Sequence, residues 1–362
     1  MLIDEFSSFE NKYLFEKKYD DFFYWVYSRY AIFSYLTKLQ EGIEMSSQKM
    51  TDGLICGIKN MIINSLRYRH KIKKIGHRDL LILNHERRVL KDGYYRCIYT
   101  EQIEEHYPNS VVLERPYFYK HLKPIQTERI FYSDCVELES LIYGFLECKL
   151  KAKKFFEKEM SIVAPEFQHM VKQEVSVEAL SEMLTRLYLL YCVKRKKFEK
   201  IIQKIQPKVI LEVVSYNLDC MIFNEIAYEK KINTIELQHG VMSGSIAYYY
   251  PKNVLIKQFP QKVFLFSDYW KNCISVPLED KNVISVGYPY FEEQVKKYQK
   301  INCDKNKTTK VILFLSQWTI GENFSKFAVE FNNLINGKWK IIYKLHPGEY
   351  ANWKKRYPWL VN

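Results

Sequence analysis

The stretch 207–240, PKVILEVVSYNLDCMIFNEIAYEKKINTIELQHG, decides the fold class of this chain. The apolar run 209–214 predicts a strand, 218–230 predicts a helix, and 233–237 predicts a second strand. A strand, a helix and a strand in this order form a βαβ unit with parallel strands. The sequence therefore predicts an α/β protein.

Polar residues follow the second of these strands directly. His239 stands between Gln238 and Gly240, at the carboxyl edge where open α/β sheets bind their ligands. A histidine there is suited to general base chemistry near neutral pH, and Gly240 allows a positive φ and a close approach to a ligand. Glu236 faces either the same cleft or solvent. A purely structural role for His239 is the alternative.

A second α/β unit follows along the chain. Segments 263–266 and 283–289 predict further strands of the first unit, and a polar stretch after Glu292 predicts a linker. The second unit consists of strand 311–315, helix 322–336 and strand 339–345. It delivers Lys344 and His346 to its own strand end, a pair suited to a phosphate or diphosphate.

The N-terminal part contains three informative segments. Residues 22–33 carry one charge and predict a mostly buried helix, with an interfacial membrane helix as the alternative. Segment 79–84 predicts a buried strand that ends in a polar turn, His85-Glu86-Arg87-Arg88. Segment 137–204 predicts helices. The acidic cluster Asp134, Glu137 and Glu139 is predicted to be solvated surface.

Composition and missing motifs narrow the function. The formal net charge of +13 favours polyanions, anionic lipid or a phosphorylated substrate as partners. The eight cysteines include no CxxC pair, which favours a reducing compartment, and the chain shows neither a signal peptide nor a run of about 18 apolar residues. The nucleotide-binding and hydrolase motifs GxGxxG, GxxxxGK[ST], HExxH and GxSxG do not occur.

Four short motifs follow one another in the second half of the chain: Ile235-Glu236-Leu237-Gln238-His239-Gly240-Val241, Val286-Gly287-Tyr288-Pro289, Leu313-Phe314-Leu315-Ser316-Gln317 and Tyr343-Lys344-Leu345-His346-Pro347-Gly348. In this order they resemble the bacterial capsule and lipopolysaccharide glycosyltransferases of the GT-B fold. More broadly, they are similar to CDP-glycerol glycerophosphotransferases, which pair an HG motif with KPHP, and to bacterial sialyltransferases, which share the His-Pro element. The resemblance covers about residues 207–350.

The resemblance implies two facing Rossmann-like units and a transferase that needs neither a metal nor a cofactor. Such an enzyme moves a sugar or polyol phosphate from a nucleotide-activated donor to a growing surface polysaccharide. His346 is expected to contact the donor phosphate, together with Lys344, Ser316 and Gln317. His239 and Glu236 are the expected catalytic residues, and the expected acceptor-side residues are Gln238, Gly240, His85 and Arg87.

The sequence departs from the family pattern at two points. Leu345 replaces the first proline of KPHP, and the acidic motif that supplies the base in sialyltransferases is not evident. A GT-B C-terminal half also needs more strands than the chain supplies. We therefore expect an acceptor-side α/β domain with a helical N-terminal extension at 1–300, and the incomplete start of a nucleotide-donor domain at 308–362.

Two other functions stay open. One is a non-catalytic subunit, or an inactive fragment, that binds a glycan or a partner transferase. The other is a sugar-nucleotide epimerase, which is also built from two α/β halves. The expected partners are a nucleotide-activated sugar and a glycan or lipid-linked acceptor. Nucleic acid is not expected, because no nucleic-acid-binding signature accompanies the basic stretches. The expected location is the cytoplasm, with attachment to the inner face of the cell membrane left open.

Overall fold

A computed structural model describes residues 2–10, 12–41, 51–85, 88–116, 121–146, 149–251, 254–299, 310–317, 320–350 and 352–361. The chain divides into two compact units, Met1–Glu292 and Glu293–Asn362. Unit 1 contains the helices α1 (Leu2–Phe9), α2 (Lys12–Glu16), α3 (Tyr24–Gln40), α4 (Thr51–Lys74), α5 (Glu101–His106), α6 (Asp134–Leu146), α7 (Lys149–Val171), α8 (Val177–Ile205) and α9 (Leu218–Lys230). Helix α10 (Pro289–Gln299) begins before the boundary and continues past Glu292, where the sequence predicted a linker.

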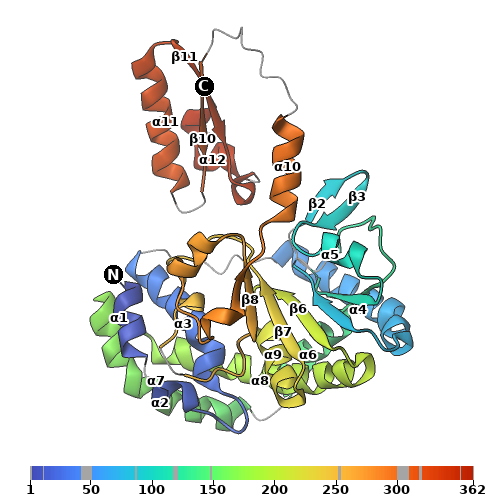
Figure 1. Cartoon of the computed structure of the whole chain (residues 1–362). Helices are drawn as coiled ribbons and strands as arrows, with labels where there is room; N and C mark the ends of the chain where they lie inside the picture. Colours follow the sequence, from blue (N-terminus) through green and yellow to red (C-terminus); the bar gives the residue numbers. More distant parts are fainter. Residues whose placement is uncertain are drawn as a thin grey trace. The chain divides into compact units, whose positions relative to one another are not determined.

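Unit 1 is built on a parallel sheet of seven strands (Figure 1). The strands are β1 (Leu80–Leu83), β4 (Ser110–Glu114), β5 (Ile130–Tyr132), β6 (Val209–Val213), β7 (Asn233–Leu237), β8 (Lys262–Leu265) and β9 (Val283–Ser285). A separate antiparallel hairpin consists of β2 (Arg88–Lys91) and β3 (Tyr94–Cys97). The predicted α/β class is confirmed.

The strand order in this sheet is β5-β4-β1-β6-β7-β8-β9. The chain builds outward from β1 in one direction, through β4 and β5, and then returns to add β6 to β9 on the other side of β1. This is the Rossmann-like arrangement, whose order reverses between β1 and β6. In such sheets the ligand site lies outside the carboxyl ends of the strands on either side of the reversal.

Alternate residues of each strand face two different cores. Leu81 and Leu83 of β1 face the larger core, which contains α3 and the α7 to α9 helices, whereas Leu80 and Ile82 face the smaller one. The predicted βαβ unit is confirmed as β6, α9 and β7, and Figure 1 shows α8 and α9 next to these strands. The side chain of Asn217 starts α9 by accepting a hydrogen bond from the Cys220 amide.

The N-terminal aromatic segment lies inside the larger core. In α3, Tyr24, Trp25 and Ile32 are at most 2% exposed. The prediction of a mostly buried helix is therefore confirmed. The predicted helical region 137–204 is likewise confirmed, as α6, α7 and α8. Among the helices of the described residues, none carries an apolar stretch long enough to cross a bilayer.

The predicted solvation of the acidic cluster is wrong for two of its members. Asp134 is 1% exposed, and its Oδ2 lies 2.7 Å from His121 Nε2. Glu137 Oε1 accepts a hydrogen bond of 2.7 Å from Lys194, which is itself buried. His121 is 13 residues from Asp134 in the sequence, and Lys194 is 57 residues from Glu137. The local sequence pattern therefore does not indicate either partner.

Two buried carboxylates lie side by side in the middle of the sheet. Glu212 of β6 and Glu236 of β7 are in register on neighbouring strands, and neither is exposed to solvent. Burial, and then the nearby Glu236 charge, raise the pKa of Glu212 to about 8. Asn224 donates a hydrogen bond of 2.9 Å to Glu212 Oε1. The folded protein therefore favours the protonated form of Glu212.

This pKa shift predicts a stability that falls as pH rises. Below the ordinary pKa of 4.5 both states hold the proton, whereas between 4.5 and about 8 only the folded state does. Glu212→Gln keeps an acceptor for Asn224 and carries no charge, so we expect it to remove this part of the pH dependence. At pH 9 the variant should be more stable by on the order of 2–4 kcal/mol. Urea unfolding at pH 4, 7 and 9 measures this. The exposed Glu279→Gln is the control, and an unchanged pH slope in Glu212→Gln would contradict the assignment.

Unit 2 contains one βαβ unit, as predicted. Parallel strands β10 (Lys310–Leu315) and β11 (Trp339–Lys344) are joined through α11 (Gly321–Ile335). A short helix α12 (Trp353–Arg356) follows.

Candidate functional site

Two of the predicted histidines come together at the carboxyl edge of the unit 1 sheet. His85 follows β1 and His239 follows β7, and their rings stack with centroids 5.9 Å apart. Tyr216 follows β6, which lies between these two strands, and its hydroxyl is 3.3 Å from His239 Nε2. All three side chains are half-buried. The cluster lies at the edge where the sheet topology predicts a ligand.

The backbone around His239 is fixed by neighbouring side chains. Tyr99 donates its hydroxyl to the carbonyl of His239 at 2.6 Å. Gln238 is buried, donates to the Gly240 carbonyl at 2.8 Å, and accepts from the Phe266 amide at 2.7 Å. Gln238 therefore holds this loop in place, and because it also lines a cavity, its acceptor-side role stays a prediction.

The glycine expectation also needs correction. Gly240 does not adopt a positive φ, whereas Gly244, four residues later, has φ +73°. Apart from its two chain neighbours, no described residue places a heavy atom within 4 Å of the position that a Cβ would take at Gly240. The open space beside Gly240 fits the predicted acceptor side, but the left-handed turn of this loop is made at Gly244.

Glu236 lies beneath the site and not in it. Its Oε1 accepts hydrogen bonds from the Ser215 amide at 3.0 Å and from the Tyr248 hydroxyl at 2.7 Å. Burial raises the pKa of this carboxyl above its usual range. Because Ser215 directly precedes Tyr216, Glu236 is placed to hold the turn that presents Tyr216 to His239. This is a positioning contact.

Two cavities adjoin the histidine cluster. The first, of about 260 Å³, lies at the ends of β7, β8 and β9, and we call it the aromatic pocket. Its wall includes Tyr288, which stacks on Phe266 at 4.3 Å and on Tyr99 at 5.9 Å between ring centroids. Tyr288 belongs to the second of the four sequence motifs. That motif, whose role the sequence left open, therefore lines a cavity beside His239.

The second cavity, of about 90 Å³, lies at the ends of β1, β4 and β6, and we call it the switch-point pocket. His85 lines it, together with polar residues that sequence analysis missed: Asn84, Arg115, Asn217 and Asp219. Asn217 and Asp219 could have been found from the sequence, because they lie at the start of a predicted helix that directly follows a predicted strand. Nothing local marked Arg115.

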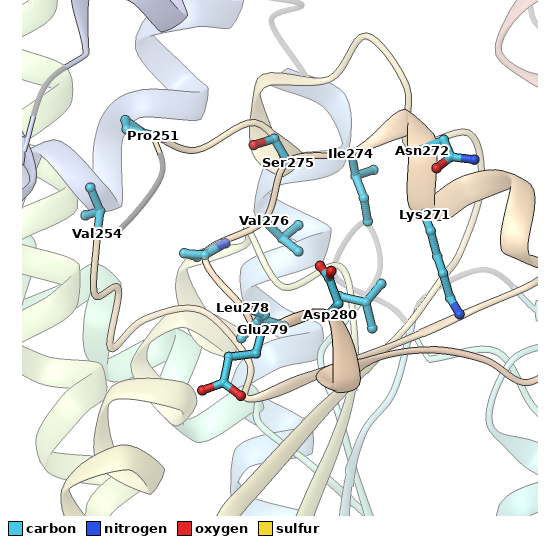
Figure 2. Close-up of a pocket in the computed structure, with 12 residues that line it drawn as sticks. Pro251, Val254, Lys271, Asn272, Ile274, Ser275, Val276, Leu278, Glu279 and Asp280 are labelled. Carbon is cyan, nitrogen blue, oxygen red and sulfur yellow. The ribbon is translucent and has the colours of Figure 1, made fainter.

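A larger hollow lies elsewhere in unit 1. It has about 770 Å³, and Figure 2 shows it between the chain around Val254 and the segment from Lys271 to Asp280. Lys271 is paired with Asp268 at 2.8 Å. None of the predicted site residues lines this hollow.

The predicted donor-side residues all lie at one edge of unit 2. Ser316 and Gln317 follow β10, and His346 follows β11, whose last residue is Lys344. The Ser316 amide donates to the Lys344 carbonyl at 2.9 Å. Lys344 and Gln317 are exposed, and His346 is half-buried.

The Ser316 hydroxyl donates to a buried carboxylate, a contact that the sequence did not predict. Glu349 Oε1 accepts from Ser316 Oγ at 3.0 Å and from the Tyr357 hydroxyl at 2.6 Å, while Oε2 accepts from the His346 amide at 2.6 Å. Burial opposes ionisation, but these hydrogen bonds lower the pKa of Glu349 below its usual range. The Ser316 hydroxyl is thus engaged by a protein carboxylate, and its role at a donor phosphate stays a prediction.

Gly321 is the residue that makes room for this network. A Cβ at Gly321 would lie 2.1 Å from Glu349 Oε1 and 2.3 Å from the Tyr357 hydroxyl. We expect Gly321→Ala to displace both groups and to destabilise unit 2 by about 1–3 kcal/mol. Hydrogen exchange of the β10 and β11 amides measures this as a loss of protection. Asn333→Ala, on the exposed face of the same helix, should leave protection unchanged. Equal protection in both variants would show that Glu349 and Tyr357 can shift without loss of stability, which would contradict the prediction.

Two further points concern Arg87 and metal binding. Arg87 lies outside the described residues. Among the residues that are described, no group of three or more His, Cys, Asp or Glu side chains is arranged to hold a metal ion.

No family model and no curated protein matches this sequence. Among solved structures, the chain is similar to the UDP-GlcNAc 2-epimerase from Neisseria meningitidis bound to UDP-GlcNAc. The identity is 11%, the match covers 78% of this chain and 69% of that chain, and the TM-score is 0.37. A likeness at this level identifies neither an activity nor a ligand.

Proposed function

We propose that the chain is a glycosyltransferase that moves a sugar or polyol phosphate from a nucleotide-activated donor to the hydroxyl of a surface glycan. The observation that carries the proposal is the placement of His239. Its Nε2 meets the Tyr216 hydroxyl at the carboxyl edge of the sheet, and the two cavities adjoin this cluster.

His239 is the proposed general base. Burial raises the pKa of Tyr216, so its hydroxyl stays protonated at neutral pH, 3.3 Å from Nε2. In the tautomer that carries its proton on Nδ1, Nε2 accepts from this hydroxyl. A ring nitrogen that accepts a hydrogen bond is the basic nitrogen of a neutral imidazole. When an acceptor hydroxyl takes the place of Tyr216, its proton goes to Nε2 while its oxygen attacks the donor carbon or phosphorus. The bond to the nucleotide phosphate breaks, and that phosphate leaves with the electron pair.

The donor phosphate is assigned to unit 2. His346 and Lys344 provide a half-buried imidazole and an exposed ammonium at one strand end. Positive or hydrogen-bond-donating groups at a leaving phosphate stabilise the charge that develops there. The net charge of +13 favours approach of both the donor and an acidic or membrane-bound acceptor.

The test is a conversion assay on the full chain with UDP-, GDP- and CDP-linked sugars and CDP-glycerol. Each donor is incubated with and without oligosaccharide fragments of surface glycans, and products are read by mass spectrometry. We expect nucleotide release that depends on the acceptor, together with a matching mass gain on the glycan. Isomerisation of the donor without an acceptor would identify an epimerase instead. Glycan binding without any conversion would identify a non-catalytic subunit.

A further inference from the structure

The switch-point pocket has the location and the strain of a ligand site. It lies between β1 and β6, where the strand order of the sheet reverses. Val214, directly after β6, lines it with φ +69°, a left-handed conformation that a β-branched residue rarely adopts. Asn217 holds this conformation by donating both its backbone and its side-chain nitrogen to the Val214 carbonyl, at 3.2 and 2.8 Å. Such strain costs about 1–3 kcal/mol and concentrates at functional sites.

A buried carboxylate on the pocket wall has unused hydrogen-bonding capacity. Asp219 is 5% exposed, and its Oδ1 accepts from Lys194 at 2.7 Å. Its Oδ2 has no hydrogen-bond partner among the described residues, and the Arg115 guanidinium lies 3.9 Å from it. Burial opposes ionisation of Asp219, but Lys194 and Arg115 hold its pKa below the usual range. The ionised oxygen therefore lacks the donor that a buried carboxylate normally has.

The charges around the pocket indicate what that donor is. Arg115 and Asp219, which line the pocket and lie 3.9 Å apart, carry opposite formal charges that match each other. The pocket thus offers no net positive charge to an anion. A hydroxyl group suits it, because it donates to Asp219 and accepts from the guanidinium. Asn84 adds a side-chain amide to the pocket wall, whereas the amide of Asn217 is engaged with Val214 and Cys220.

We propose that the switch-point pocket binds an uncharged, hydroxyl-bearing portion of the acceptor, such as part of a sugar ring or a polyol. This rests on the proposed function in one respect, which is that the ligand is the acceptor. The position of His85 on the pocket wall, with its ring stacked on His239, places such a hydroxyl group beside the proposed base. The pocket, of about 90 Å³, holds part of such a ring or a short polyol segment and not a whole oligosaccharide.

The experiment measures equilibrium binding of glycerol, methyl β-D-glucopyranoside and inorganic phosphate to the full chain, without any donor. Side-chain amide NMR signals of Asn84 and Asn217 report the switch-point pocket, and Gln102 reports the aromatic pocket. We expect glycerol or the glucoside to shift the two asparagine signals. Arg115→Gln and Asp219→Asn should each weaken this binding by about tenfold or more. Arg78→Gln, at a half-buried arginine before β1 and outside the pocket, is the matched control.

Three results would overturn the proposal: no asparagine shift with either neutral ligand, shifts with phosphate alone, or unchanged affinity in Arg115→Gln. The Arg115 side chain is 35% exposed, so this variant tests the pocket even if Asp219→Asn fails to fold after leaving Lys194 short of a partner. Because no donor is present, the binding result decides the pocket assignment whatever the transfer assay gives. Absence of transfer together with neutral-ligand binding would overturn the proposed function and leave the pocket assigned.

Discussion

Replacement of His239 by glutamine is expected to lower the rate of glycosyl transfer by about 10²–10⁴-fold, the range that a general base contributes. Glutamine retains polar atoms near the Tyr216 hydroxyl but takes up no proton. The loss should appear in kcat, because the proton moves only as the acceptor attacks. Acceptor affinity should change little, since the two cavities beside the cluster stay intact.

The control for this variant is His169→Gln, an exposed histidine of α7. Tyr216→Phe separates positioning from base chemistry, because it removes the hydroxyl and leaves the imidazole. We expect a smaller loss from Tyr216→Phe than from His239→Gln. A kcat that stays unchanged in His239→Gln, or that falls equally in His169→Gln, would remove His239 from the mechanism.

The largest expected loss of stability comes from Arg29, whose replacement by methionine should cost about 3–5 kcal/mol. Its guanidinium is 1% exposed and pairs with Glu10 through two contacts, of 2.7 and 2.5 Å. It also donates to the carbonyls of Ile246 and Tyr249 at 2.6 Å each. Removing the cation leaves the Glu10 carboxylate buried without its charged partner and two carbonyls without these donors.

Urea unfolding of unit 1 measures this effect, with the exposed Arg186→Met as control. If the unpaired carboxylate causes most of the loss, the double variant Arg29→Met with Glu10→Gln should recover part of it. Glu10→Gln keeps an acceptor for Trp25 Nε1, which donates to Glu10 at 2.8 Å. A single variant as stable as the control would show that this ion pair contributes nothing net.

Local sequence patterns predicted the parts of the fold that depend on neighbouring residues. The β6, α9 and β7 elements match their predicted ranges because apolar runs, the Asn217 cap and helix-compatible residues agree over 207–240. Strand β4 was missed although Val111-Val112-Leu113 is a short apolar run, because a run of three residues does not distinguish a strand from a buried loop.

The site was predicted only in part, for a different reason. The sequence places His85 and His239 at strand ends, but their proximity depends on β6 lying between β1 and β7, which no local pattern encodes. Glu236 alternates with apolar neighbours as a solvent-facing residue would, yet its register partner Val263 belongs to the larger core, so Glu236 lies on a covered face of the sheet. The partners of Asp134, Glu137 and Asp219 come from distant helices and loops, so their burial could not be inferred.

The Arg29 contacts also constrain the order in which the protein is completed during synthesis. Arg29 emerges from the ribosome long before its carbonyl partners, which lie 217 and 220 residues further along the chain. Until residues 246–249 have been synthesised, the Arg29 guanidinium of α3 lacks these two carbonyl acceptors. The segment that encloses it, 246–249, follows the loop that carries His239. Helix α3 and the carboxyl edge of the sheet around His239 therefore reach their final packing in the same late step. Contacts between residues so far apart in the sequence are slow to form.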